Sequence, residues 1–259
     1  MHFTAAQIMS LLGAYVWPFT RIGAMVSVAP ILGTHSVPMR IRLGLAIALT
    51  MVIAPMVPPI RGIALFSIAG VIVTFQQFLI GLAIGFSVRL VFSAMETGGN
   101  AVANLMGLGF ANVVDPQNGV QVPVLSQFFT TLAALLFLSL DGHLVLVQVM
   151  TDSFRTLPVG ITGLSRGGVW QLVSWAGWIF TGGVLIALPA IAALLIVNVS
   201  FGVMTRAAPQ LNIFAVGFPI TLILGFVVLT ATLPTIAPKF TDLVSRSFDL
   251  TRFLVRPGG

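Results

Sequence analysis

Hydrophobic residues form long continuous blocks along this chain. Uncharged stretches cover residues 22–39, 43–60, 62–88, 97–114, 116–140, 167–205 and 207–238. A helix needs about 20 mainly apolar residues to cross a bilayer. We therefore predict six hydrophobic helices, near residues 5–33, 43–60, 63–94, 122–150, 169–200 and 211–236. A β-barrel would require short alternating segments, so the pattern predicts an all-α, polytopic integral membrane protein.

Proline and glycine interrupt these blocks. Prolines lie within or near them at Pro18, Pro30, Pro55, Pro189, Pro219 and Pro234. Each removes a backbone donor and favours a kink. Gly81 and Gly85 form a GxxxG motif, which permits close helix approach, although a chain with 26 glycines is expected to contain one by chance. Kinked helices that pack against other protein are therefore expected.

Composition excludes several classes of protein. Only 18 of the 259 residues are charged and 58% are apolar, whereas a soluble domain of this length carries roughly 65 charged residues. An ordinary soluble enzyme and a disordered chain are therefore excluded. The net charge of +6 is scattered from Arg21 to Arg256, so no nucleic-acid-binding patch is predicted. No basic region precedes the first apolar block, which we expect to be retained rather than cleaved.

Motifs for chemistry are absent from the sequence. The chain has no cysteine, and its three histidines, at His2, His35 and His143, are far apart. No pair of carboxylates has catalytic spacing, and no serine lies in a nucleophile motif. We therefore expect no metal site, no cofactor and no enzymatic activity.

Polar residues within apolar blocks carry more information. They are Arg21, Gln76, Gln77, Arg89, Asp141 and Asn198. Because a charge near the bilayer centre is costly, each must pair, reach the interface or face water. Arg21 and Arg89 could reach the interface from a helix end. Asp141 could pair with an arginine, belong to a proton relay, or mark a break between two half-helices at Asp141-Gly142-His143.

Basic residues indicate the orientation. In a six-span arrangement with a cytoplasmic N-terminus, the inner segments carry Arg61, Arg155, Arg166, Lys239, Arg246, Arg252 and Arg256, and the outer segments carry Arg40, Arg42 and Arg206. This asymmetry favours cytoplasmic termini.

Residues 97–122 do not resemble a spanning helix. The segment is rich in glycine, alanine and asparagine and leads into the turn signal Asp115-Pro116-Gln117-Asn118-Gly119. Polar backbone at membrane depth is tolerated where it lines a water-filled space or is buried in protein. We interpret the segment as a re-entrant or pore-facing structure, with an extramembrane loop as the alternative. Its apolar residues, Met106, Leu108, Phe110, Val113 and Val114, could close a pore.

The C-terminal tail, residues 238–259, has a different pattern. Phe240, Leu243, Val244, Phe248 and Leu254 recur near helical spacing between charged residues. This predicts an amphipathic helix on a membrane or against a partner; a solvated tail is the alternative.

Three blocks resemble one family. They are residues 115–128 (DPQNGVQVPVLSQF), residues 138–160 (LSLDGH with the downstream DSF and LPVG) and residues 206–219 (RAAPQLNIF followed by GFP). Together they resemble the R subunits of bacterial flagellar type III export gates (the FliR family), which are similar to the T subunits of injectisomes. The third block is the most specific, and the resemblance covers about residues 10–237.

The resemblance implies a partner set and an architecture. R subunits join P and Q subunits in a helical ring of bent hairpins, the entry pore for unfolded flagellar proteins. Further expected partners are the B subunit (the export switch), the A subunit and the rod and MS-ring of the basal body, with the complex in the bacterial inner membrane. Residues 1–166 would form a P-like half and residues 167–237 a Q-like helical hairpin.

The resemblance also implies site residues. R subunits carry a loop that plugs the closed pore, and by position it maps onto about 106–122, the segment that composition had already distinguished. Met106, Leu108, Phe110, Val113 and Val114 are then apolar plug candidates, while Asp115, Pro116, Asn118 and Gly119 shape the turn. Arg21, Arg89, Asp141 and Arg206 become structural or inter-subunit polar anchors.

Two other functions remain as alternatives. A stand-alone secondary transporter of a small solute would suit broken helices and midplane charges, but its inverted repeat is not evident. An intramembrane enzyme would need a catalytic pair that the sequence lacks.

Overall fold

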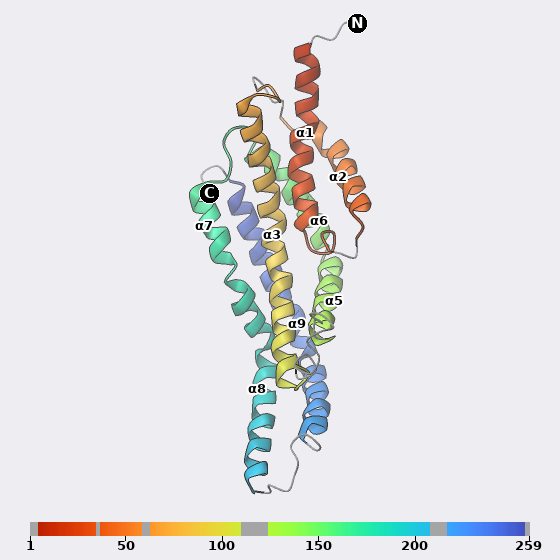
Figure 1. The fold of residues 1–259 in the computed structure, drawn as a ribbon, viewed down its shortest axis with the longest axis vertical. Helices are drawn as coiled ribbons and strands as arrows, with labels where there is room; N and C mark the ends of the chain where they lie inside the picture. Colours follow the sequence, from red (N-terminus) through yellow and green to blue (C-terminus); the bar gives the residue numbers. More distant parts are fainter. Residues whose placement is uncertain (1–4, 35–36, 59–62, 110–123, 208–216, 257–259) are drawn as a thin grey trace, which may run out of the picture. The chain divides into compact units, whose positions relative to one another are not determined.

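The computed structural model describes residues 5–34, 37–58, 63–109, 124–207 and 217–256 (Figure 1). Every regular element in these ranges is helical. The helices are α1 (Ala5–Val28), α2 (Met39–Ile53), the short 3-10 helix η1 (Ala54–Met56), α3 (Ile68–Leu105), α5 (Val124–Ser139), α6 (Gly142–Thr156), α7 (Arg166–Trp175), α8 (Trp178–Ala207) and α9 (Phe218–Leu254). The all-α prediction is confirmed.

Membrane-spanning capacity also agrees with the sequence. Five apolar stretches in the described ranges are long enough to cross a bilayer, or up to six if the bent pair α5 and α6 is one span. These two helices meet at 66°. The break lies at Asp141, whose φ of 54° is left-handed. Of the interpretations of Asp141-Gly142-His143, the break between half-helices is therefore confirmed.

Helices α3 and α9 are longer than predicted. They contain 38 and 37 residues, which at 1.5 Å per residue gives about 57 and 55 Å. A bilayer core is about 30 Å thick, so each helix must extend beyond it. The helix expected at 63–94 continues to Leu105. The first part of the segment interpreted as re-entrant or pore-facing, residues 97–105, therefore continues α3 as helix.

The described residues divide into two compact units. The first contains residues up to Leu90, Leu138–Ala176 and the chain from Val244, while the second contains Val91–Phe137 and Gly177–Leu243. Because α3 and α9 contribute to both units, this division differs from the boundary expected at residues 166 and 167. That boundary concerns likeness to P and Q subunits and stays a prediction.

In the first unit, α1 and α3 pack through the GxxxG motif. A Cβ atom at Gly81 would overlap the carbonyl oxygen of Arg21, and one at Gly85 would lie 2.7 Å from the carbonyl oxygen of Met25. Only glycine allows backbones to approach so closely. A nearby hydrogen bond from Trp17 Nε1 to Thr74 Oγ1, at 3.1 Å, joins the same two helices. The motif is therefore a genuine packing site and not a chance occurrence.

In the second unit, glycines of α3 contact two other helices. A Cβ atom at Gly98 would lie 2.9 Å from the carbonyl oxygen of Gly183 in α8, and one at Gly99 would lie 2.8 Å from Cα of Ser126 in α5. Two turns earlier in α3, Phe92 makes edge-to-face contacts with Phe137 of α5 and Phe240 of α9, at centroid distances of 5.6 and 6.0 Å. Close backbone contact and aromatic packing thus hold these helices together.

The C-terminal tail is helical, as predicted, but it continues α9 without a break as far as Leu254. Its apolar face is covered by the chain itself. Phe240 and Leu243 are buried in the second unit, and Val244, Phe248 and Leu254 are buried in the first. The expectation that this face rests on a membrane or on a partner is therefore wrong.

The packing at Gly81 generates a test. We expect Gly81→Ala to destabilise the protein by about 1–3 kcal/mol, because the new methyl group overlaps the α1 backbone. The matched control is Gly23→Ala in α1, where an added Cβ meets nothing within 4 Å; it should be neutral or stabilising by up to about 1 kcal/mol. Thermal unfolding in detergent, followed by helical circular dichroism, measures both. Equal losses of stability in Gly81→Ala and Gly23→Ala would contradict the close packing of α3 on α1 at Gly81.

Candidate functional site

The most complete polar cluster in the described residues surrounds Arg21, whose side chain is 0% exposed. Its Nε donates a hydrogen bond to Gln77 Oε1 at 2.8 Å, and Nη2 donates to the same oxygen. Nη1 donates to the carbonyl oxygen and to Oγ of Ser153, both at 3.0 Å. Nη2 also reaches the carbonyl oxygen of Leu157 at 3.0 Å. One side chain therefore joins α1, α3 and the end of α6.

The cluster stabilises a buried cation without a carboxylate. Ser153 lies in the last turn of α6, where its carbonyl also accepts the N–H of Leu157, and Leu157 directly follows the helix end. The carbonyls at the C-terminal end of a helix carry a partial negative charge. The Phe154 ring adds a cation–π contact, with its centroid 4.3 Å from Arg21 Cζ. Helix carbonyls, the Gln77 side chain and an aromatic face therefore stabilise the guanidinium in place of a carboxylate. The alternative that Arg21 reaches the interface is wrong, because its side chain is fully buried.

Gln77 is the matching acceptor on α3. Two Arg21 hydrogen bonds fix its Oε1 toward the guanidinium, while its buried Nε2 has no hydrogen-bond partner among the described residues. The neighbouring Gln76 lies against Gly163, where an added Cβ would overlap Oε1 of the glutamine. The two glutamines therefore point to different sides of α3.

The other predicted polar anchors are not brought together. Arg89 is half-buried in α3, Asp141 is exposed at the break before α6, and Arg206 is exposed in the last turn of α8. None of their side chains forms a hydrogen bond or an ion pair within the described parts of the chain. The structure therefore offers no support, among the described residues, for the predicted pairing of Asp141 with an arginine.

The described part of the predicted plug begins with a helix stop. Gly107 has a φ of 83°, its N–H donates to the carbonyl of Asn104, and the N–H of Leu108 donates to that of Ala103. These bonds form a Schellman motif. The sequence reasoning missed it, although Gly107 after a helical pattern is a recognised stop signal.

Two contacts hold this helix end within the second unit. Met106 is completely buried, and an added Cβ at Gly225 of α9 would lie 2.6 Å from its Cγ and Cε atoms. Asn198 Nδ2 of α8 donates to the carbonyl of Leu105 at 3.1 Å, which explains the asparagine within an apolar block. Leu108 is half-buried. The remaining plug candidates, Phe110, Val113, Val114, Asp115, Pro116, Asn118 and Gly119, lie outside the described residues.

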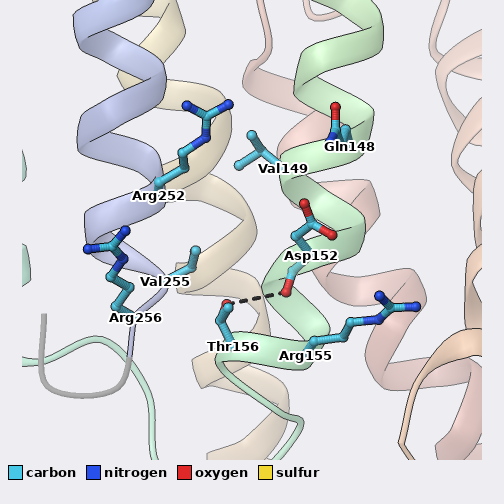
Figure 2. Close-up of a pocket in the computed structure, with 8 residues that line it drawn as sticks. All are labelled: Gln148, Val149, Asp152, Arg155, Thr156, Arg252, Val255 and Arg256. Carbon is cyan, nitrogen blue, oxygen red and sulfur yellow. Dashed lines mark hydrogen bonds between the residues drawn. The ribbon is translucent and has the colours of Figure 1, made fainter.

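A charged pocket in the first unit was not foreseen from the sequence (Figure 2). It is lined by Gln148, Val149, Asp152, Arg155 and Thr156 of α6, by Arg252 of α9, and by Val255 and Arg256 just after it. Figure 2 shows the guanidinium of Arg155 directed away from α9. Arg252 forms an exposed ion pair with Asp249 at 3.5 Å. The basic groups therefore do not converge on one anion.

No group of three potential metal ligands occurs among the residues that the structure describes.

The Arg21 cluster generates the second test. Arg21→Met should destabilise the protein by about 2–4 kcal/mol, because the buried acceptors lose their donors. Arg21→Lys should recover little of this, since an ammonium lacks the planar fork of donors. Adding Gln77→Leu to Arg21→Met should cost less than the sum of the single changes, because the two residues are in contact.

Thermal unfolding of the purified chain measures these effects, with Arg40→Met as the control that removes an exposed arginine. Additive losses for Arg21→Met and Gln77→Leu would contradict the cluster as one unit.

Comparison with known proteins identifies the family. Residues 12–247 match the model for bacterial export proteins, family 1. The flagellar biosynthetic protein FliR of Escherichia coli (strain K12) is 41% identical over 250 residues, which cover 96% of this chain and 95% of the relative. The FliR protein of Pectobacterium carotovorum subsp. carotovorum is 39% identical, with 96% and 95% covered. That of Bacillus subtilis (strain 168) is 28% identical, with 96% and 97% covered.

These matches extend over nearly the whole chain and include both compact units. They agree with the resemblance found in three sequence blocks. The chain belongs to family 1 of the bacterial export proteins, together with the flagellar biosynthetic proteins FliR.

Proposed function

We propose that this chain is the R subunit of a flagellar type III export gate, a structural component of the pore for unfolded flagellar proteins. The observation that carries the proposal is the 41% identity to a FliR protein over 96% of the chain. The proposed location is the bacterial inner membrane, within the flagellar basal body. The role is structural and uses no cofactor.

Uncovered apolar surface supports assembly with other subunits. Large hydrophobic side chains are exposed along α8, including Phe180, Ile196 and Val199, and along the first half of α9, including Ile223 and Val227. Lipid can cover part of this surface. Other protein subunits can cover the rest of it. P and Q subunits of the gate are the proposed neighbours.

Three polar residues are proposed contacts for other subunits. The side chains of Arg89, Asp141 and Arg206 form no hydrogen bond or ion pair among the described residues, and Asp141 and Arg206 are exposed. A neighbouring subunit could supply each with an opposite charge or a backbone group. The B and A subunits, the rod and the MS-ring are proposed as further contacts of the assembled gate, and unfolded flagellar proteins as its substrates.

The plug is proposed for the segment that follows Gly107. The Schellman motif, the burial of Met106 on α9 and the Asn198 hydrogen bond support a firm attachment at its start. A rigid attachment allows a short segment to occupy one position in a pore. Phe110, Val113 and Val114 are the proposed apolar contacts, and Asp115, Pro116, Asn118 and Gly119 the proposed turn.

Copurification tests the subunit assignment. We expect the affinity-tagged chain, extracted from its own host in mild detergent, to appear in native mass spectra as one copy bound to several copies of two small hydrophobic proteins. The physical reason is the apolar surface that the chain leaves uncovered. A stable monomer or homodimer alone would contradict the assignment and favour the stand-alone transporter, for which solute flux in liposomes is the next measurement.

Shortening tests the plug. We expect deletion of residues 110–119 to leave complex assembly intact but to make the membrane leaky to ions, because the proposed closure is removed. Met106 and Gly107 stay in place, so the end of α3 keeps its packing. Ion flux across vesicles that contain the purified complex measures the effect.

The matched control replaces residues 110–119 with ten glycine and serine residues. It keeps the chain length but removes the apolar side chains, and it should also leak if those side chains close the pore. Normal assembly with no added leak in either variant would exclude a plug at this position.

A further inference from the structure

A proline in α8 removes one backbone hydrogen bond near the crossing with α9. Pro189 lies inside α8 and has no N–H, so the carbonyl of Leu185 loses its usual donor four residues later. In an apolar protein, an unpaired carbonyl is costly, and water is not available to satisfy it within a membrane. Some other group must provide the hydrogen bond.

Lys239 of α9 provides it. Its Nζ donates a hydrogen bond to the carbonyl oxygen of Leu185 at 2.6 Å. Both residues belong to the second unit, and they line one shallow pocket with Ile186, Pro238, Asp242 and Leu243. The bond is short because the donor is charged. The ammonium therefore satisfies the carbonyl that the proline leaves without its helical donor.

Neighbouring contacts place this hydrogen bond at a fixed helix crossing. One turn away on each helix, Gly182 lies against Leu243, where an added Cβ would be 3.0 Å from Cδ1 of the leucine. The pairs Gly182 with Leu243 and Leu185 with Lys239 run in opposite directions along the two helices, as an antiparallel hairpin requires. Ile186, Ala187, Ala190 and Phe240 are buried around them. The hydrogen bond of Lys239 thus lies beside a close contact between the two helices.

We infer that Lys239 is a positioning residue: its ammonium replaces the backbone donor lost at Pro189 and fixes the segment of α8 before this proline against α9. Lys239 is also the first charged residue after the uncharged stretch 207–238. A lysine in that place commonly anchors a helix end at the membrane interface. The two roles predict different effects of removing the lysine, because replacement of a lost backbone donor depends on Pro189 and anchoring at the membrane interface does not.

The test is a double-mutant cycle between the two residues in the full chain. Lys239→Met keeps the length of the side chain but removes the donor, and it should lower the midpoint of thermal unfolding by about 5 °C. Pro189→Ala restores an N–H donor for the carbonyl of Leu185. In this background, Lys239→Met should lower the unfolding midpoint by less than half of its effect in the original chain. Lys239→Arg keeps a cationic donor and should behave like the original protein. Arg40→Met, which removes an exposed basic residue of the other unit, is the control for charge loss.

A second measurement reports on geometry. The chain contains no cysteine, so spin labels can be placed on Leu188→Cys in α8 and Thr241→Cys in α9, both at exposed positions. We expect Lys239→Met to broaden the distribution of distances between the labels and Pro189→Ala to narrow it again. If Pro189→Ala does not fold, Pro189→Gly restores the same N–H group.

Equal losses from Lys239→Met with and without Pro189 would overturn the inference and assign the lysine to interface anchoring. An unchanged distance distribution in Lys239→Met would overturn it as well. These readouts use the chain without other subunits, so they fail or succeed independently of the export-gate proposal.

Discussion

The need to satisfy backbone carbonyls without water governs much of this structure. The chain is 58% apolar, and unpaired polar groups are costly in such surroundings. Arg21 donates to carbonyls at the end of α6, Asn198 donates to the end of α3, and Lys239 donates to a carbonyl next to a proline. In each case a polar side chain from another helix donates to a backbone carbonyl at a helix end or four residues before a proline. The few polar residues of the apolar blocks therefore connect helices.

Glycine residues allow the helices to pack closely beside these hydrogen bonds. Helices whose backbones approach closely exclude solvent and strengthen short polar contacts between them. Gly81 and Gly85 bring α3 against α1 near Arg21, and Gly182 brings α8 against α9 near Lys239. Close packing and cross-helix hydrogen bonds thus occur at the same crossings.

Family membership and the physical features support the same proposal in different ways. Similarity to FliR proteins covers both compact units. The exposed apolar faces of α8 and α9, the excess length of α3 and α9, and the firm attachment at Met106 are properties that a subunit of a larger pore would use. The described charged pocket shows mixed charge and no converging cations, so it adds no ligand to this picture.

The sequence alone determined the helical class, the approximate number of candidate spans and the family. It offered the GxxxG contact and the break at Asp141 as alternatives among others, and the structure chose between them. These features depend on local pattern, on composition or on residues contiguous in the chain. The tertiary structure decided which side-chain donor forms a hydrogen bond with which backbone carbonyl. No local signal pairs Arg21 with the end of α6, or Lys239 with Leu185, because the partners are more than 50 residues apart. The covering of the tail's apolar face was misread for the same reason: an amphipathic pattern shows that a face is buried, and only the fold shows what buries it.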